Sequence, residues 1–369
     1  MVDLTAWAVT PVASHSFFSG FPLILATASE AAETGPLILA GVLLSLVVIY
    51  LAAKLVGELC ARFNLPPVLG ELVGGVLVGV SVFNVLVFPD ENGVTHSLII
   101  NFLQATAGLT AEATPNVAGS ISEVISLLSE LGVIILLFEI GLESDLKELI
   151  RVGPQAAVVA VVGVAVPFTA GTAGLITLFG VPAIPAIFAG AALTATSIGI
   201  TAKVLAEIQQ LSSREGQIII GAAVLDDVLG IIVLAVVASL AKTGEIEVSN
   251  IIYLVVGASV FLVGSIFLGR LLSPYFVALV DRLQTRGNLL LSSLIFAFIL
   301  SYIGAVIQLE AILGAFAAGL ILAETEKQKE LEEQILPIAD MLVPIFFVVV
   351  GARTDVSVLN PAIPSNQAG

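Results

Sequence analysis

The sequence predicts an all-α polytopic membrane protein, and two observations carry this prediction. Of its 369 residues 58% are hydrophobic and 11% charged, whereas about a quarter of the residues of soluble domains are charged. The apolar residues recur in blocks of about 20, the length at which a helix spans a hydrocarbon core of about 30 Å. A lipid-exposed single strand would leave its backbone groups unpaired, so each block is expected to be a helix.

Ten segments reach or approach this length, and together they predict one membrane domain over residues 36–355. Residues 1–35 are expected to form an external leader. Within it FFSGFPLILATA (17–28) resembles a secretory apolar core, but no Lys or Arg precedes it, so we favour a retained leader over a cleaved signal peptide. The ten segments are 36–58, 66–88, 119–142, 153–178, 183–206, 216–240, 250–271, 287–307, 309–324 and 335–352.

The basic residues predict the orientation. Lys242 and Arg353 lie at one set of alternate loops, and the other 11 of the 13 Lys and Arg residues lie at the opposite set or at the helix ends beside it. Cytoplasmic loops carry the excess of positive charge, so the larger set is expected to be cytoplasmic. Both ends of the chain would then be external or lumenal, as would the connection between Phe88 and Gly119.

The remaining composition excludes several classes of protein. The single cysteine, Cys60, excludes a disulfide framework within the chain. A net charge of −16 argues against nucleic-acid binding, which needs a basic surface. His15 and His96 lie in polar or terminal stretches and are expected to be solvated. No cofactor and no enzymatic activity are expected.

Two pairs of segments resemble each other, and the members of a pair are expected to cross the membrane in opposite directions. VLGELVGGVLVG (68–79) aligns with ILGAFAAGLILA (312–323), and LLFEIGLESDL (136–146) aligns loosely with FFVVVGARTDV (346–356). The first pair occupies spans two and nine, which enter the membrane from opposite faces because an odd number of spans separates them. This arrangement is the inverted repeat of many secondary transporters.

The repeat predicts a domain organisation. The first copy would cover about 66–240. Linking helices would follow over 250–307, and an incomplete second copy would cover 309–369. Because the second copy has only two spans where the first has five, we expect a truncated form of a protein with thirteen spans, of which ten are present.

Span five carries a cluster of hydroxyl groups around a glycine, LTATSIGIT (193–201). Such small residues also serve close helix packing. The density of Thr194, Thr196 and Ser197 favours an interrupted helix instead, whose carbonyl and hydroxyl oxygens would face a hard cation.

Two adjacent aspartates, Asp226 and Asp227, stand in the otherwise apolar run GQIIIGAAVLDDVLGIIVLAVVASLA (216–241). Asp226 lies about ten residues into span six, which at 1.5 Å per residue is roughly 15 Å, or half of the apolar thickness. An ionised carboxylate at that depth costs several kcal/mol, so a function is expected. Neighbouring helical residues point about 100° apart, so one aspartate can face a cation cavity and the other a different helix. A carboxylate there binds either a proton or a small cation such as Na⁺, and the two compete.

Three other acidic residues are candidates for ion access. Glu71 and Glu139 lie within one or two turns of the predicted cytoplasmic side, and Glu130 lies deeper in span three. An ordinary interfacial role explains the first two equally well.

These motifs together resemble the cation:proton antiporter superfamily of sodium/proton exchangers, in its NapA-like and Kef-type branch and among its cyanobacterial members. The likeness extends from about Leu37 to Asp355. It implies a thirteen-helix, dimeric inverted-repeat fold in which one half moves as an elevator, in a bacterial plasma or thylakoid membrane. It also implies that Asp227 is the main cation and proton carboxylate and Asp226 its neighbour. Thr194, Thr196 and Ser197 match the crossover of the first broken helix.

The resemblance implies electrogenic exchange of Na⁺, Li⁺ or K⁺ for two protons, because aspartate occupies both positions of the pair. The family places its basic partner in the three spans that we expect to be absent, which puts transport by this chain alone in doubt. Kef-type K⁺ efflux and a non-transporting ion sensor remain alternatives. An intramembrane aspartyl protease is excluded, because its two aspartates must lie on separate helices.

Overall fold

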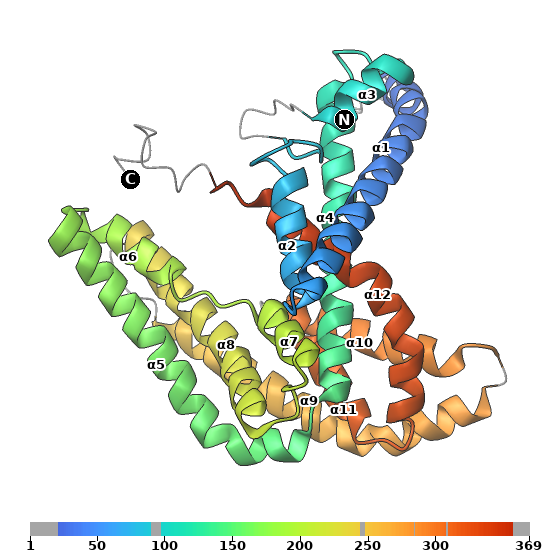
Figure 1. Ribbon diagram of the computed structural model, residues 1–369. Helices are drawn as coiled ribbons and strands as arrows, with labels where there is room; N and C mark the ends of the chain where they lie inside the picture. Colours follow the sequence, from blue (N-terminus) through green and yellow to red (C-terminus); the bar gives the residue numbers. More distant parts are fainter. Residues whose placement is uncertain (1–20, 90–96, 244–247, 284, 308, 357–369) are drawn as a thin grey trace, which may run out of the picture. The chain divides into compact units, whose positions relative to one another are not determined.

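The computed structural model describes residues 21–89, 97–243, 248–283, 285–307 and 309–356, and in these ranges it contains helices and no strand (Figure 1). The prediction of an all-α protein is therefore confirmed. The helices are α1 (Phe21–Arg62), α2 (Pro67–Val78), α3 (Leu98–Thr106), α4 (Thr114–Glu143), α5 (Leu146–Phe179), α6 (Ala183–Ala192), α7 (Ile198–Glu207), α8 (Arg214–Thr243), α9 (Val248–Arg282), α10 (Asn288–Val306), α11 (Ala311–Ala323) and α12 (Gln328–Arg353).

Each of the ten predicted spans overlaps an apolar helical segment. Six described helices are long and apolar enough to cross a bilayer, namely α1 from Thr34, α4, α5, α8, α10 and α12. Four shorter apolar segments, Pro67–Val78, Ala183–Ala192, Val255–Ser265 and Ala311–Ala323, occupy the other predicted positions. The protein is thus a polytopic membrane protein.

Three boundaries differ from the prediction. The second span was expected to reach residue 88, but α2 ends at Val78 because a side chain at Gly79 would overlap the carbonyl of Ala352. The Val80 N–H donates to that same carbonyl at 3.0 Å, so the chain pairs with the end of α12 instead of continuing the helix.

The other two differences concern the first loop and the leader. The expected external loop contains α3, which begins where the Ser97 hydroxyl accepts a hydrogen bond from the Ile99 N–H at 3.2 Å. The helix α1 begins at Phe21, so residues 21–35 of the predicted leader are helical. Residues 1–20 lie outside the described residues.

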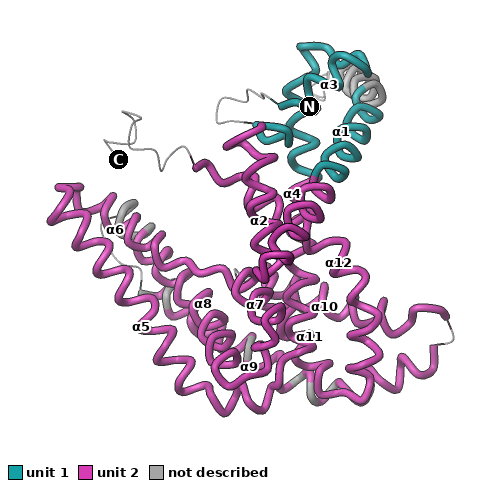
Figure 2. Tube along the Cα trace, viewed as in Figure 1, with its two compact units in different colours: residues 1–48, 84–124 teal, residues 49–83, 125–369 magenta. Residues whose placement is uncertain are grey.

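The chain divides into two compact units (Figure 2). Unit 1 comprises residues 1–48 and 84–124, and Ile99, Ile100, Leu103, Val117 and Ile121 are buried in it. Unit 2 comprises residues 49–83 and 125–369, and it holds every candidate site residue. Its largest apolar core joins α4, α7, α8, α11 and α12.

Unit 2 shows the same close helix contact twice, as an inverted repeat requires. On α2, a Cβ atom at Gly75 would lie 3.0 Å from Gly351 Cα on α12. On α11, a Cβ atom at Gly319 would lie 2.8 Å from Gly141 Cα on α4. The aligned repeats match Gly75 with Gly319 and Gly141 with Gly351. Equivalent glycines therefore make equivalent contacts.

A second pair of contacts extends the correspondence. A Cβ atom at Gly70 on α2 would lie 2.6 Å from the Gly57 nitrogen on α1, and one at the equivalent Gly314 on α11 would lie 2.5 Å from the Ser301 nitrogen on α10. We propose that the repeats begin with α1 and α10, one helix earlier than the sequence suggested. The helix α9 would then link them.

Candidate functional site

The fifth predicted span is interrupted in the middle, as expected. The helix α6 ends at Ala192 and α7 begins at Ile198. Ser197 is extended, with φ −81° and ψ 106°, and its hydroxyl accepts from the Ile200 N–H at 3.4 Å. The Thr194 hydroxyl donates to the Ala191 carbonyl at 2.8 Å. Hydroxyl side chains compete in this way with helical hydrogen bonds, which explains why the helix breaks here.

The break brings two helix ends together at one place. The last carbonyl groups of α6 and the first N–H groups of α7 have no partner within their own helix. The carbonyl end of a helix is negative and favours cations. An interruption of this kind at membrane depth is typical of ion and substrate sites in transporters.

The aspartate pair lies beside this break. The helix α8 packs against α5, α6 and α7 (Figure 1), and the side chain of Asp226 is hydrogen-bonded to that of Thr196. Asp226 is only 9% exposed. The structure therefore brings together two features that lie thirty residues apart in the chain, as the sequence predicted.

Asp227 points elsewhere, as expected for adjacent helical residues. Its Oδ2 atom is buried and has no hydrogen-bond partner among the described residues. Asp226 and Glu310 repel its charge. Glu310 is the residue before α11, and the sequence analysis did not select it. Its position just before the second copy of the glycine motif is the feature of the sequence that could have identified it as a site residue.

The structure groups two of the three predicted ion-access acids with a lysine on α7. The largest attractive charge for both Glu71 on α2 and Glu139 on α4 is Lys203. Lys203 also attracts Glu143 and Glu207. These five residues are called the Lys203 cluster below.

Glu130, the third predicted access residue, is exposed on α4, and its role stays a prediction. Sequence reasoning missed Lys203 as part of a site, because it was counted only as a topological marker. It also missed Asp340 on α12, whose charge repels both Glu71 and Glu139.

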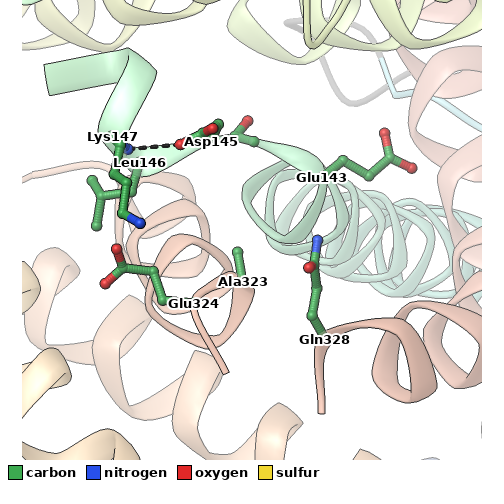
Figure 3. A pocket seen from close by; sticks show the side chains of 8 residues that line it. Glu143, Asp145, Leu146, Lys147, Ala323, Glu324 and Gln328 are labelled. Carbon is green, nitrogen blue, oxygen red and sulfur yellow. Dashed lines mark hydrogen bonds between the residues drawn. The ribbon is translucent and has the colours of Figure 1, made fainter. Parts of the chain in front are cut away.

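A cavity of about 620 Å³ opens beside one member of the cluster (Figure 3). It lies where α4 and α11 end and where α5 and α12 begin, and we call it the α4–α11 cavity. The cavity is polar and carries more acidic than basic groups. Its lining residues are Glu143, Ser144, Asp145, Leu146, Lys147, Ala323, Glu324 and Gln328.

Local hydrogen bonds hold the walls of this cavity. The Asp145 carboxylate accepts from the Lys147 N–H at 2.8 Å, which caps the start of α5 (Figure 3). The Gln328 amide donates to the Leu142 carbonyl at 2.8 Å and so joins α12 to the end of α4. Three carboxylates against one ammonium group give the cavity a net negative charge, which attracts cations.

Comparison with known proteins places this geometry in a family. The model of the family described as sodium/hydrogen exchanger, transmembrane, matches residues 42–367. The chain belongs to the sodium/hydrogen exchanger family. The match covers both halves of the broken span and all of α8, so the candidate site lies inside the family domain.

Individual relatives agree with this assignment. The chain is 70% identical over 351 residues to the high-affinity Na⁺/H⁺ antiporter NhaS3 of Synechocystis, an alignment covering 95% of this chain and 76% of NhaS3. It is 32% identical to the Na⁺/H⁺-K⁺ antiporter GerN of Bacillus cereus, over 82% of this chain and 69% of GerN.

A solved structure of the sodium proton antiporter MjNhaP1 from Methanocaldococcus jannaschii shares the fold. The TM-score is 0.55 with 16% sequence identity, over 89% of this chain and 73% of that protein. The expected superfamily and antiporter fold are thus confirmed.

Proposed function

We propose that the protein exchanges Na⁺ for protons across a membrane at the α6–α7 break and the Asp226–Asp227 pair. The observation that carries the proposal is the hydrogen bond between Asp226 and Thr196. It supports a site in which this carboxylate lies beside the carbonyl and hydroxyl oxygens of the interrupted helix. The names of the relatives support Na⁺ as the cation.

The chemistry follows from oxygen ligands and competition. Carboxylate, hydroxyl and carbonyl oxygens suit hard cations, and Asp226, Asp227, Thr194, Thr196 and Ser197 supply them. A proton on either aspartate removes the negative charge that holds the cation. Cation and proton therefore exclude each other from the site. If the site moves between the two faces of the membrane only when it is occupied, the cation crosses in one direction and protons return in the other.

Electrogenic exchange is the form of transport that the charges favour. Both charges that act on Asp227 in the described part of the chain are acidic. If both carboxylates are ionised while the cation is bound, they would take up two protons when one monovalent cation leaves. One net charge would then cross the membrane in each cycle.

K⁺ is the second candidate cation, because GerN is named a Na⁺/H⁺-K⁺ antiporter. We further propose that the protein forms a homodimer in a bacterial plasma or thylakoid membrane. The Lys203 cluster would lie on the cytoplasmic side. The distribution of basic residues supports this orientation.

Flux measurements test the proposal. The full-length protein is reconstituted into liposomes with a pH-sensitive dye, and Na⁺, Li⁺ or K⁺ is added at several pH values. We expect Na⁺-dependent proton movement that falls at least about tenfold in Asp226→Asn and Asp227→Asn, since each loses one charged ligand. Glu215→Gln, an exposed acid in the first turn of the same helix, should transport normally. Equal fluxes in all variants would contradict the proposal.

A further inference from the structure

Two glutamates of unit 2 outside the aspartate pair, Glu71 and Glu139, have a buried oxygen without a partner among the described residues, and Glu139 is the more buried of the two. Glu139 on α4 is 5% exposed, and its Oε2 atom has no hydrogen-bond partner among the described residues. Buried carboxylates are normally paired or hydrogen-bonded. A proton on this oxygen would remove the unpaired charge.

The charges around Glu139 come from three helices. Lys203 on α7 attracts it, while Glu143 on its own helix and Asp340 and Glu332 on α12 repel it. Glu71 on α2 competes for the same ammonium group. The helix α11, which contacts α4 at Gly141, has no charged residue in its sequence from 311 to 323.

These charges do not balance within the cluster. Lys203 attracts Glu71, Glu139, Glu143 and Glu207, and Lys54 also attracts Glu71. Two ammonium groups cannot neutralise four carboxylates, and both Glu71 and Glu139 have a buried oxygen without a partner in the described structure. A further positive charge is therefore needed. A proton bound to Glu139 would supply this charge.

Glu139 also has a route to water. Glu143 lies four residues later on α4, one helical turn away, and it lines the α4–α11 cavity (Figure 3). A proton from water in the cavity could pass to Glu143 and then to Glu139. One O–H bond of a hydronium ion in the cavity would break and one would form on the carboxylate, so that the charge of Glu139 changes from −1 to 0.

The lysine whose charge attracts Glu139 belongs to the helix that follows the break. It stands on α7, whose first residue follows the break, and Glu207 at the end of α7 accepts from the Val68 N–H of α2 at 3.3 Å. Any displacement of α7 at the break would change the distance between Lys203 and Glu139. The protonation of Glu139 would then follow the position of α7.

We propose that Glu139 is a second proton-binding group, separate from Asp226 and Asp227, which exchanges its proton with the α4–α11 cavity under the control of Lys203. The inference deepens the proposed function and rests on it for the movement of α7. Glu139 would take up a proton when Lys203 withdraws and release it when Lys203 returns.

Infrared difference spectroscopy of the purified full chain tests the inference. Spectra at acid and neutral pH, with and without Na⁺, report the C=O stretch of protonated carboxyl groups. We expect a band that persists in the Asp226→Asn, Asp227→Asn double variant and disappears in Glu139→Gln. Glu123→Gln, an exposed acid on the same helix, is the matched control and should keep the band. In Lys203→Met the band should no longer respond to Na⁺.

The outcomes separate the two proposals. An unchanged carboxyl spectrum in Glu139→Gln, with the protein folded as judged by its circular dichroism, would overturn the inference whatever the flux assay shows. A Na⁺ response of the band that survives in Lys203→Met would overturn the role of the lysine. Failure of the proposed antiport would appear instead as absent flux in the wild-type chain, while the Glu139 band could still be observed.

Discussion

The paired glycine contacts yield a prediction about stability. An alanine at Gly75 would overlap the Val348 carbonyl and place its Cβ 3.0 Å from Gly351 Cα, and an alanine at Gly319 would place it 2.8 Å from Gly141 Cα. The carbonyl oxygens are closer still, because the added Cβ would lie 2.2 Å from that of Val348 at Gly75 and 2.3 Å from that of Phe138 at Gly319. Non-bonded heavy atoms pack at about 3.5 Å, so the helices must separate by roughly 1 Å at both positions.

The magnitude follows from two opposing effects. Adding a methyl group to a packed interface costs about 1–3 kcal/mol, and replacing a helical glycine by alanine gains up to about 1 kcal/mol. We therefore expect Gly75→Ala and Gly319→Ala each to lower the free energy of unfolding by about 1–2 kcal/mol. The inverted repeat predicts that the two substitutions change the free energy of unfolding in the same direction and by a similar amount.

Thermal unfolding in detergent, followed by circular dichroism or intrinsic fluorescence, measures the effect. Gly163→Ala on α5 is the matched control, because no atom lies within 4 Å of the added Cβ, and it should be neutral or stabilising. If Gly75→Ala and Gly319→Ala melt with the control, the close helix contacts do not limit stability. If only one of them is destabilising, the two interfaces are not equivalent.

Two further predictions concern α7 and the break. Thr196→Val removes the hydroxyl that bonds Asp226, and a hydrogen bond to a charged group contributes about 1.5–3 kcal/mol, so the KM for Na⁺ in the flux assay should rise about tenfold or more. An unchanged KM would show that this hydroxyl has no part in binding, and Thr177→Val, an exposed hydroxyl on α5, is the control. Glu207→Ala removes the acceptor of the Val68 N–H, so that amide should exchange hydrogen faster in mass spectrometry, whereas Glu58→Ala, at an exposed site on α1, should leave it unchanged. Equal exchange in both variants would exclude a link between α7 and the start of α2.

Much of the helical architecture could be predicted because membrane depth restricts the choices. Each apolar block had to be a helix, since backbone groups in lipid need internal partners. The interruption between Ala192 and Ile198 was predictable from its hydroxyl residues, which bond locally and weaken the helix. The proximity of Asp226 to Thr196 followed from depth alone, because both lie near the middle of neighbouring spans.

Tertiary contacts decided the features that the sequence did not reveal. The α2 helix ends at Val78, where Gly79 meets Ala352, a residue more than 270 positions later. The only local signal for that stop is the glycine itself, a residue that often follows a helix. The Lys203 cluster was missed for a similar reason. Its carboxylates come from α2, α4 and α7, and an acidic residue near a membrane boundary gives no indication of which charge it will face.

The central claim is that protons and Na⁺ compete for the carboxylates beside the α6–α7 break. Proton release on addition of Na⁺ to the purified protein, recorded with a pH indicator in weakly buffered detergent solution, tests this claim most directly. We predict release by the wild-type protein, at Na⁺ concentrations that increase as the pH is lowered, and none from the Asp226→Asn, Asp227→Asn double variant. Na⁺ binding that is independent of pH, or proton release that persists in the double variant, would contradict it.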